Sequence, residues 1–297
     1  MATFGELHDQ TPQLVGPEMP PCVCRVTRTR GSQLCFCQTL TRDEVPDGST
    51  KLIAAVRGED EPYQYRCGEN EDYVKLLLAR GELVDDVDCI GRTALLHAAT
   101  MDMTDRVSCG HKSYIRILLD AGANIDHQMG EGNTALMEAV SADLVDNAME
   151  LIAAGANVKL TNKHGLSAMH YATVSSIPRP GPLVEALLKA GADPNVVVWG
   201  MAPIHLAARE GNMDAVCLLV HARVSVDTPD AYGKTPLHDA VECKRHACAI
   251  MLVGLGANLG ARTMYGETPL DTATRVKDAA MIAILKQAAI EPRARSV

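Results

Sequence analysis

Apolar and polar residues follow one short pattern that recurs along the chain. Its clear copies read Gly-x-Thr-Pro-Leu-x-x-Ala or a close variant, so that a polar residue and a proline introduce an apolar run. Thr can cap the free N–H groups of a first helical turn, and Pro loses no hydrogen bond there. Each copy therefore predicts the start of a short α-helix, and the copies begin at Gly233, Gly266, Gly200, Gly165, Gly132, Gly91 and, most faintly, Gly48.

A second apolar pattern lies downstream in register with the first. It reads Leu-Leu-x-Ala-Gly-Ala-Asn or a close variant at residues 118–124, 151–157, 187–193 and 253–258. Gly suits the left-handed conformation in which many helices end, so the pattern predicts the end of a second helix. Arg223 occupies this glycine position in one copy, which is locally unfavourable for a residue with a Cβ.

The two patterns recur in phase, with a spacing of 33 or 35 residues from Thr134 to Thr268. They resemble the ankyrin repeat, a 33-residue unit whose first helix opens with Thr-Pro-Leu-His. The resemblance covers residues 47–290 and implies an all-α solenoid of about seven helix–turn–helix repeats with finger loops. In such a solenoid each unit buries its apolar face against its neighbours.

Three repeats carry extra residues between their two helices. The insertions are residues 59–72, 101–112 and 175–182. Turns of this kind lie on one edge of an ankyrin stack, so the insertions are either tolerated surface loops or a secondary contact edge.

Residues 1–46 do not match the repeat, and residues 291–297 form a C-terminal tail. Alternation around Arg30-Gly31-Ser32 predicts a β-hairpin in the first segment, which is otherwise partly mobile. Four thiolates on this hairpin could bind zinc, but the Cys-x-Cys spacing is not the usual one for a metal knuckle. The alternative is a hairpin whose cysteine face packs on the first repeat. The four residues are Cys22, Cys24, Cys35 and Cys37.

Composition narrows the function classes. Apolar residues make up 47% of the chain and aromatic residues only 3%, so Ala, Leu, Val and Ile must fill the core. The net charge of −9 argues against nucleic-acid binding, which needs an excess of Lys and Arg. The sequence has no run of about 18 apolar residues, so we expect no insertion into a membrane. Without a visible secretory signal, the ten cysteines indicate reduced thiols in a cytoplasmic or nuclear protein.

No motif indicates catalysis, so we expect neither an enzyme, a cofactor nor a small-molecule substrate. His170, His205 and His238 occupy the histidine position of the ankyrin motif, where the resemblance implies structural hydrogen bonds between repeats. His97 lies one position further on, and we expect it to face the surface.

The resemblance implies a protein-interaction module, an adaptor or an inhibitor, that binds another protein on its concave face. One alternative is a substrate-recognition subunit of a ubiquitin ligase. The other is a zinc- or redox-responsive regulator that acts through the N-terminal cysteines.

The expected binding face joins an aromatic half to an acidic half. Trp199, Tyr232 and Tyr265 precede the glycine in three consecutive fingers, and Met201 and Met264 flank them. Such rings are typical anchors of protein interfaces, although the tyrosines could instead pack on their own fingers. The fingers nearer the N-terminus are acidic, which favours a partner with a basic patch beside an apolar one. The acidic candidates are Asp86, Asp88 and Glu131.

Overall fold

The computed structural model describes residues 50–57, 69–101, 113–174 and 181–290. Its contacts divide the chain into residues 1–44 and 45–297, and all described residues belong to the second unit. The expected cysteine hairpin, the C-terminal tail and most of the three insertions lie outside the described residues.

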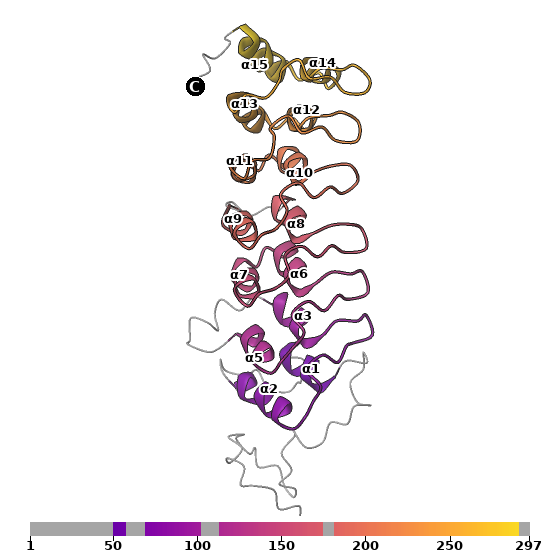
Figure 1. Ribbon diagram of the computed structural model, residues 1–297, viewed down its shortest axis with the longest axis vertical. Coiled ribbons are helices and arrows are strands. Elements are labelled where there is room, and N and C mark those ends of the chain that lie inside the picture. The colour runs from indigo at the N-terminus through magenta and orange to yellow at the C-terminus, as the bar shows by residue number, and fades with distance from the viewer. Residues whose placement is uncertain (1–49, 58–68, 102–112, 175–180, 291–297) are drawn as a thin grey trace, which may run out of the picture. The chain divides into compact units, whose positions relative to one another are not determined.

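Helices account for most of the described structure, and they come in pairs (Figure 1). The sequence-based expectation of about seven helix–turn–helix repeats is confirmed in this part of the chain. The pairs are α1 (Lys51–Arg57) with α2 (Glu69–Ala79), α3 (Ala94–Ala99) with α5 (Tyr114–Asp120), α6 (Ala135–Ser141) with α7 (Val145–Ala153), α8 (Ala168–Val174) with α9 (Gly181–Lys189), α10 (Pro203–Glu210) with α11 (Met213–His221), α12 (Pro236–Glu242) with α13 (His246–Gly254), and α14 (Pro269–Arg275) with α15 (Ala279–Ile290).

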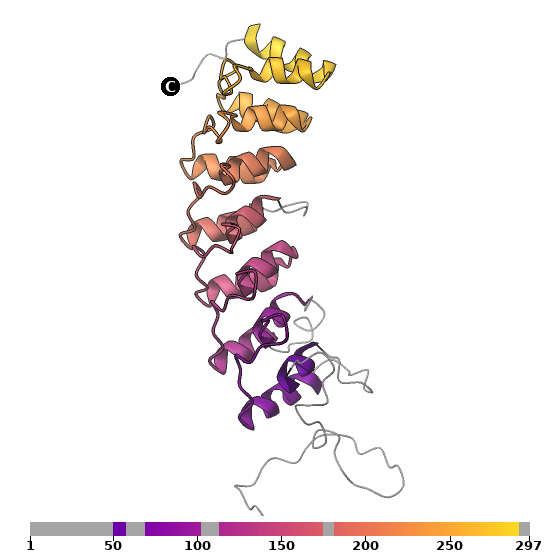
Figure 2. The ribbon, with the colours of Figure 1, turned by 90° about the vertical axis from the view of Figure 1, so that its right-hand side faces the viewer.

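The pairs stack in sequence order within this unit. The first helix of each pair packs on the first helices before and after it, as α10 does on α8 and α12. The second helices form a parallel column, in which α11 packs on α9 and α13. The finger loops that join successive pairs all extend on the side of the first helices (Figures 1 and 2). This arrangement places residues from neighbouring fingers side by side.

Helix starts follow the predicted capping chemistry. The backbone N–H groups of Leu96 and Met137 donate to the hydroxyl oxygens of Thr93 and Thr134, at 3.4 and 3.3 Å. In another repeat the backbone N–H of Thr235 donates instead to His238 Nδ1, at 3.1 Å. In these repeats the polar residue that opens the motif therefore ends the previous loop and begins the helix.

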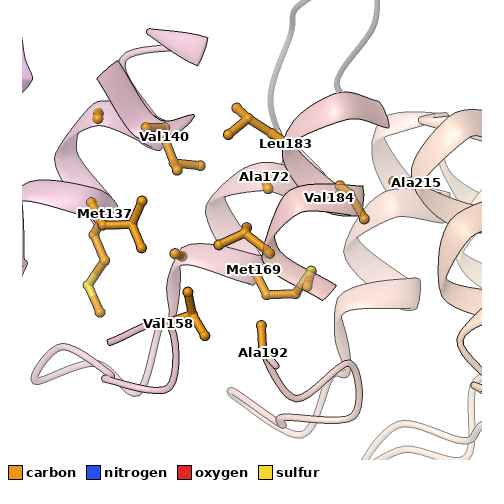
Figure 3. Close-up of a cluster of buried hydrophobic side chains, with 14 of the residues drawn as sticks. Met137, Val140, Val158, Met169, Ala172, Leu183, Val184, Ala192 and Ala215 are labelled. Atoms are coloured by element: carbon orange, nitrogen blue, oxygen red, sulfur yellow. The ribbon is translucent and has the colours of Figure 1, made fainter. Parts of the chain in front are cut away.

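Small and aliphatic side chains fill the space between layers. Met137 and Val140 of α6 face Met169 and Ala172 of α8, and Val184 of α9 lies beside them (Figure 3). Each of these side chains is at most 1% exposed. Because every layer contributes buried alanines, the core needs few large rings, as the composition indicated.

We expect Arg223→Gly to stabilise the chain by about 1 kcal/mol. Arg223 has a φ of 70°, which confirms that it occupies the left-handed position at the end of α11. The glycines at this position in five other repeats have φ between 86° and 94°. Chemical denaturation followed by circular dichroism should show a higher midpoint, and an unchanged or lower midpoint would contradict the prediction.

Candidate functional site

An acidic or amide side chain shapes three of the described finger tips. Asp88 Oδ1 accepts hydrogen bonds from the backbone N–H groups of Ile90 and Arg92, at 3.0 and 2.9 Å. Asn162 and Asp230 make the same pair of bonds in their own fingers. Each of these residues lies three positions before the finger glycine, so one side chain holds the turn closed.

The finger before α10 is built differently because it is one residue shorter. Gly200 follows Gly191 by nine positions, whereas the corresponding distance is ten in the other described fingers, as from Gly81 to Gly91. Val198 and Met201 instead exchange two backbone hydrogen bonds of 2.9 Å. The two residues between them, Trp199 and Gly200, have φ of 51° and 79°. Consecutive left-handed residues are typical of a tight hairpin turn that prefers Asn-Gly, so a tryptophan there is strained.

Backbone hydrogen bonds tie this finger to the next two. The N–H of Ala231 donates to Gly200 O at 3.0 Å, and the N–H of Met264 donates to Tyr232 O at 2.8 Å. Trp199 is 64% exposed, Tyr232 53%, Met264 65% and Tyr265 72%. We call these four residues the aromatic strip. Their exposure supports an anchor role over packing on their own fingers.

The fifth apolar candidate, Met201, is less exposed than the four residues of the strip. It is half-buried, and its sulfur accepts a hydrogen bond from Arg209 Nη1 at 3.8 Å. Met201 therefore joins the aromatic strip to the C-terminal end of α10.

The three acidic candidates occupy different environments. Glu131 is exposed and lies 3.4 Å from His164 Nε2, and Asp86 is half-buried. Asp88 is only 8% exposed. Burial favours a raised pKa for Asp88, but hydrogen bonds from Arg92, His97 and Ile90 lower its pKa below the usual value. Because its oxygens serve the finger itself, we leave Asp88 out of the proposed surface.

The structure also corrects the expectation for His97, which is buried rather than surface-facing. Its Nε2 lies 2.9 Å from Asp88 Oδ2, within its own repeat. His205 and His238 behave as the resemblance implied: each Nε2 lies 3.2–3.3 Å from a backbone oxygen of the next finger, those of Lys234 and Glu267. Burial lowers the pKa of both imidazoles, so they serve as neutral structural groups.

Sequence reasoning missed the pair formed by Arg209 and Asp239. Asp239 lies in α12, is 1% exposed, and neither of its carboxylate oxygens has a hydrogen-bond partner in the described structure. Its nearest cation is Arg209 Nη1, at 3.9 Å from Oδ1. Burial raises the pKa of Asp239 to about 7. The available signal was its register, because Leu206 holds the same position in the preceding repeat.

Two other classes of site were sought in the described residues. No three His, Cys, Asp or Glu side chains gather there as a metal site would require. None of the described helices combines the length and apolar character needed to cross a membrane. The four candidate zinc ligands of the N-terminal segment lie outside these residues.

Comparison with known proteins agrees with this architecture. Residues 105–197 and 178–263 match the family of ankyrin repeats (three copies), and together they make up more than half of the chain. Cyclin-dependent kinase inhibitor 2A of Monodelphis domestica is 33% identical over 87 residues, which are 29% of this chain and 48% of that protein. Cyclin-dependent kinase 4 inhibitor B of Homo sapiens is 32% identical over 91 residues, 30% of this chain and 63% of that protein.

The matched region therefore spans about half to two thirds of these relatives. The repeated helix pairs, the linked fingers and the family match lead to one conclusion: this chain belongs to the ankyrin-repeat family.

Proposed function

We propose that this chain is a protein-interaction module that binds its partner through the finger tips and the first helices, with the aromatic strip as the central contact. The observation that carries the proposal is the finger of Trp199. A large ring is held in a strained conformation and is mostly exposed. Strain of this kind concentrates at functional positions.

The charges of the same surface suit a partner with two different patches. The aromatic strip offers apolar area that loses little side-chain entropy on binding. Nearer the N-terminus, Asp86 and Glu131 favour a basic patch on the partner, which helps its approach and orientation.

The module acts by binding rather than by catalysis. The relatives named above are inhibitors of cyclin-dependent kinases, and their similarity supports the masking of a partner protein as the mode of action. We place the protein in the cytoplasm or the nucleus, where Cys89, Cys217, Cys243 and Cys248 would stay the free thiols of the described structure.

Affinity capture followed by mass spectrometry will supply the partner, and calorimetric titration will then measure its affinity. Trp199→Ala combined with Tyr232→Ala should weaken binding by at least about 2 kcal/mol, because both anchors of the strip are removed. The circular dichroism spectrum should be unchanged, since both side chains are mostly exposed.

The matched control removes two exposed apolar side chains from the second helices, Met213 of α11 and Ile250 of α13. Their double alanine variant should bind as the wild-type chain does. Wild-type affinity in the strip variant, or an equal loss in the control, would place the interface elsewhere.

A further inference from the structure

Three arginines lie near the C-terminal ends of the first helices in the last three repeats, and they differ in their partners. The Nε of Arg245 donates to the backbone oxygen of Arg209 at 2.8 Å, and its Nη2 lies 3.4 Å from Glu210. The guanidinium of Arg275 reaches Glu242 at 3.1 Å and Glu267 at 3.4 Å. Both guanidinium groups therefore have carboxylate partners within the fold.

The carboxylate paired with Arg209 in the described residues, that of Asp239, is too distant for a hydrogen bond. Within the described residues its side chain makes one hydrogen bond, to the sulfur of Met201. Asp239 lies 3.9 Å away and accepts no hydrogen bond from it. The Arg209 side chain is nevertheless 43% exposed, so a group of a partner protein can reach it.

This environment favours binding of an anion from outside. A guanidinium presents five N–H donors in a planar fork that matches a carboxylate in a bidentate arrangement. Asp239 lies beneath it and is buried, so its carboxylate cannot move outward to complete that arrangement without exposing the layer. The Met201 sulfur lies beside the guanidinium of Arg209. Met201 also pairs with Val198 in the hairpin whose tip carries Trp199, so Arg209 and Trp199 belong to one continuous surface.

We propose that Arg209 binds an aspartate or glutamate side chain of the partner protein, and that an apolar partner residue next to this carboxylate packs on Trp199. This inference rests on the proposed function and adds a specificity determinant to the same surface. It also orients the partner: its carboxylate faces the repeat of α10, and its basic patch faces the acidic fingers nearer the N-terminus.

Selection from a library of random peptides on the full chain tests the proposal without a known partner. Peptides enriched on the wild-type chain should carry Asp or Glu close to an aromatic or aliphatic residue. For one enriched peptide, made synthetically, Arg209→Gln should weaken binding about tenfold or more, because a charge-assisted bidentate contact is lost. Arg275→Gln is the matched control and should change affinity less than about twofold, since Glu242 and Glu267 already occupy that guanidinium.

A double-mutant cycle identifies the contact itself. Replacing the acidic residue of the peptide by its amide should weaken binding to the wild-type chain and have no further effect on Arg209→Gln. Arg209→Gln alone leaves the buried Asp239 carboxylate without a cation, which could weaken the fold. The cycle is therefore repeated in chains that carry Asp239→Asn, with and without Arg209→Gln, so that no unpaired charge is buried.

The outcomes separate this inference from the proposed function. Enriched peptides without acidic residues, or an amide substitution that acts equally on wild type and Arg209→Gln, would overturn the role of Arg209 alone. Peptides that bind the Trp199→Ala, Tyr232→Ala variant as tightly as the wild type would overturn the proposed surface. No enrichment on the wild-type chain would count against both.

Discussion

Asp239→Asn will raise the stability of the folded chain at pH 8 by roughly 2 to 4 kcal/mol and leave it almost unchanged at pH 4. Burial raises the pKa of Asp239 to about 7, above its ordinary value of 3.8 in an unfolded chain. The folded state therefore keeps a proton that the unfolded state has already lost. The stability of the wild-type chain should fall as the pH rises from about 4 to about 7, and then level off.

The amide cannot ionise, so this part of the pH dependence should disappear in the variant. Urea denaturation at a series of pH values, followed by circular dichroism, measures the effect. Asp239→Leu should show the same loss of pH dependence, because it restores the apolar residue that Leu206 provides in the preceding repeat. A wild-type chain as stable at pH 8 as at pH 5 would show that the carboxylate is solvated.

Asp271 offers a control of opposite sign. Hydrogen bonds from the backbone N–H and the hydroxyl of Thr268 lower the pKa of this exposed carboxylate. Its contribution to stability is present above pH 4 and is lost as the pH falls below that value. Asp271→Asn should therefore lower stability by a constant amount above about pH 4, converge on the wild type at more acid pH, and leave the decline between pH 4 and pH 7 intact.

Gly200→Ala will destabilise the chain by about 2 to 4 kcal/mol, more than the same change at Gly266. The two glycines have φ of 79° and 78° and therefore carry the same backbone strain when a Cβ is added. At Gly200 the new Cβ would lie 2.3 Å from the Cβ of Ala231 in the next finger. At Gly266 it would meet nothing within 4 Å.

The difference between the two variants isolates the packing of one finger on the next. Gly266→Ala should cost about 1 kcal/mol, the usual penalty for a left-handed alanine. Gly200→Ala should also weaken partner binding, because it displaces the finger that carries Trp199. Equal midpoints for the two variants in denaturant would mean that the fingers separate freely.

Local chemistry accounts for what was predicted about the fold. Thr93 and Thr134 cap helices through bonds that span three residues, and the glycines after the second helices adopt the left-handed conformation that the motif requires. Arg223 followed the same rule even without a glycine. Such features repeat with the sequence period because each depends only on its own few residues.

The candidate surface was predictable only in part. The places of Tyr232 and Tyr265 one residue before a finger glycine follow from the motif. The hairpin that strains Trp199 follows from a finger that is one residue shorter than the others, and this was not anticipated. Asp88 and His97 were expected at the surface, yet they bond to each other across nine residues of their own repeat.

The sequence by itself determined the repeat, the starts of the first helices, the ends of the second helices and the line of finger-tip aromatics, because periodic local signals specify them. Only the tertiary structure decided that Asp239 is buried without a hydrogen bond, that Arg209 is left half exposed above it, and that Gly200 touches the next finger while Gly266 touches none. Each of these properties depends on which side chains the neighbouring repeat presents. That contact arises when two layers stack, and no single repeat encodes it.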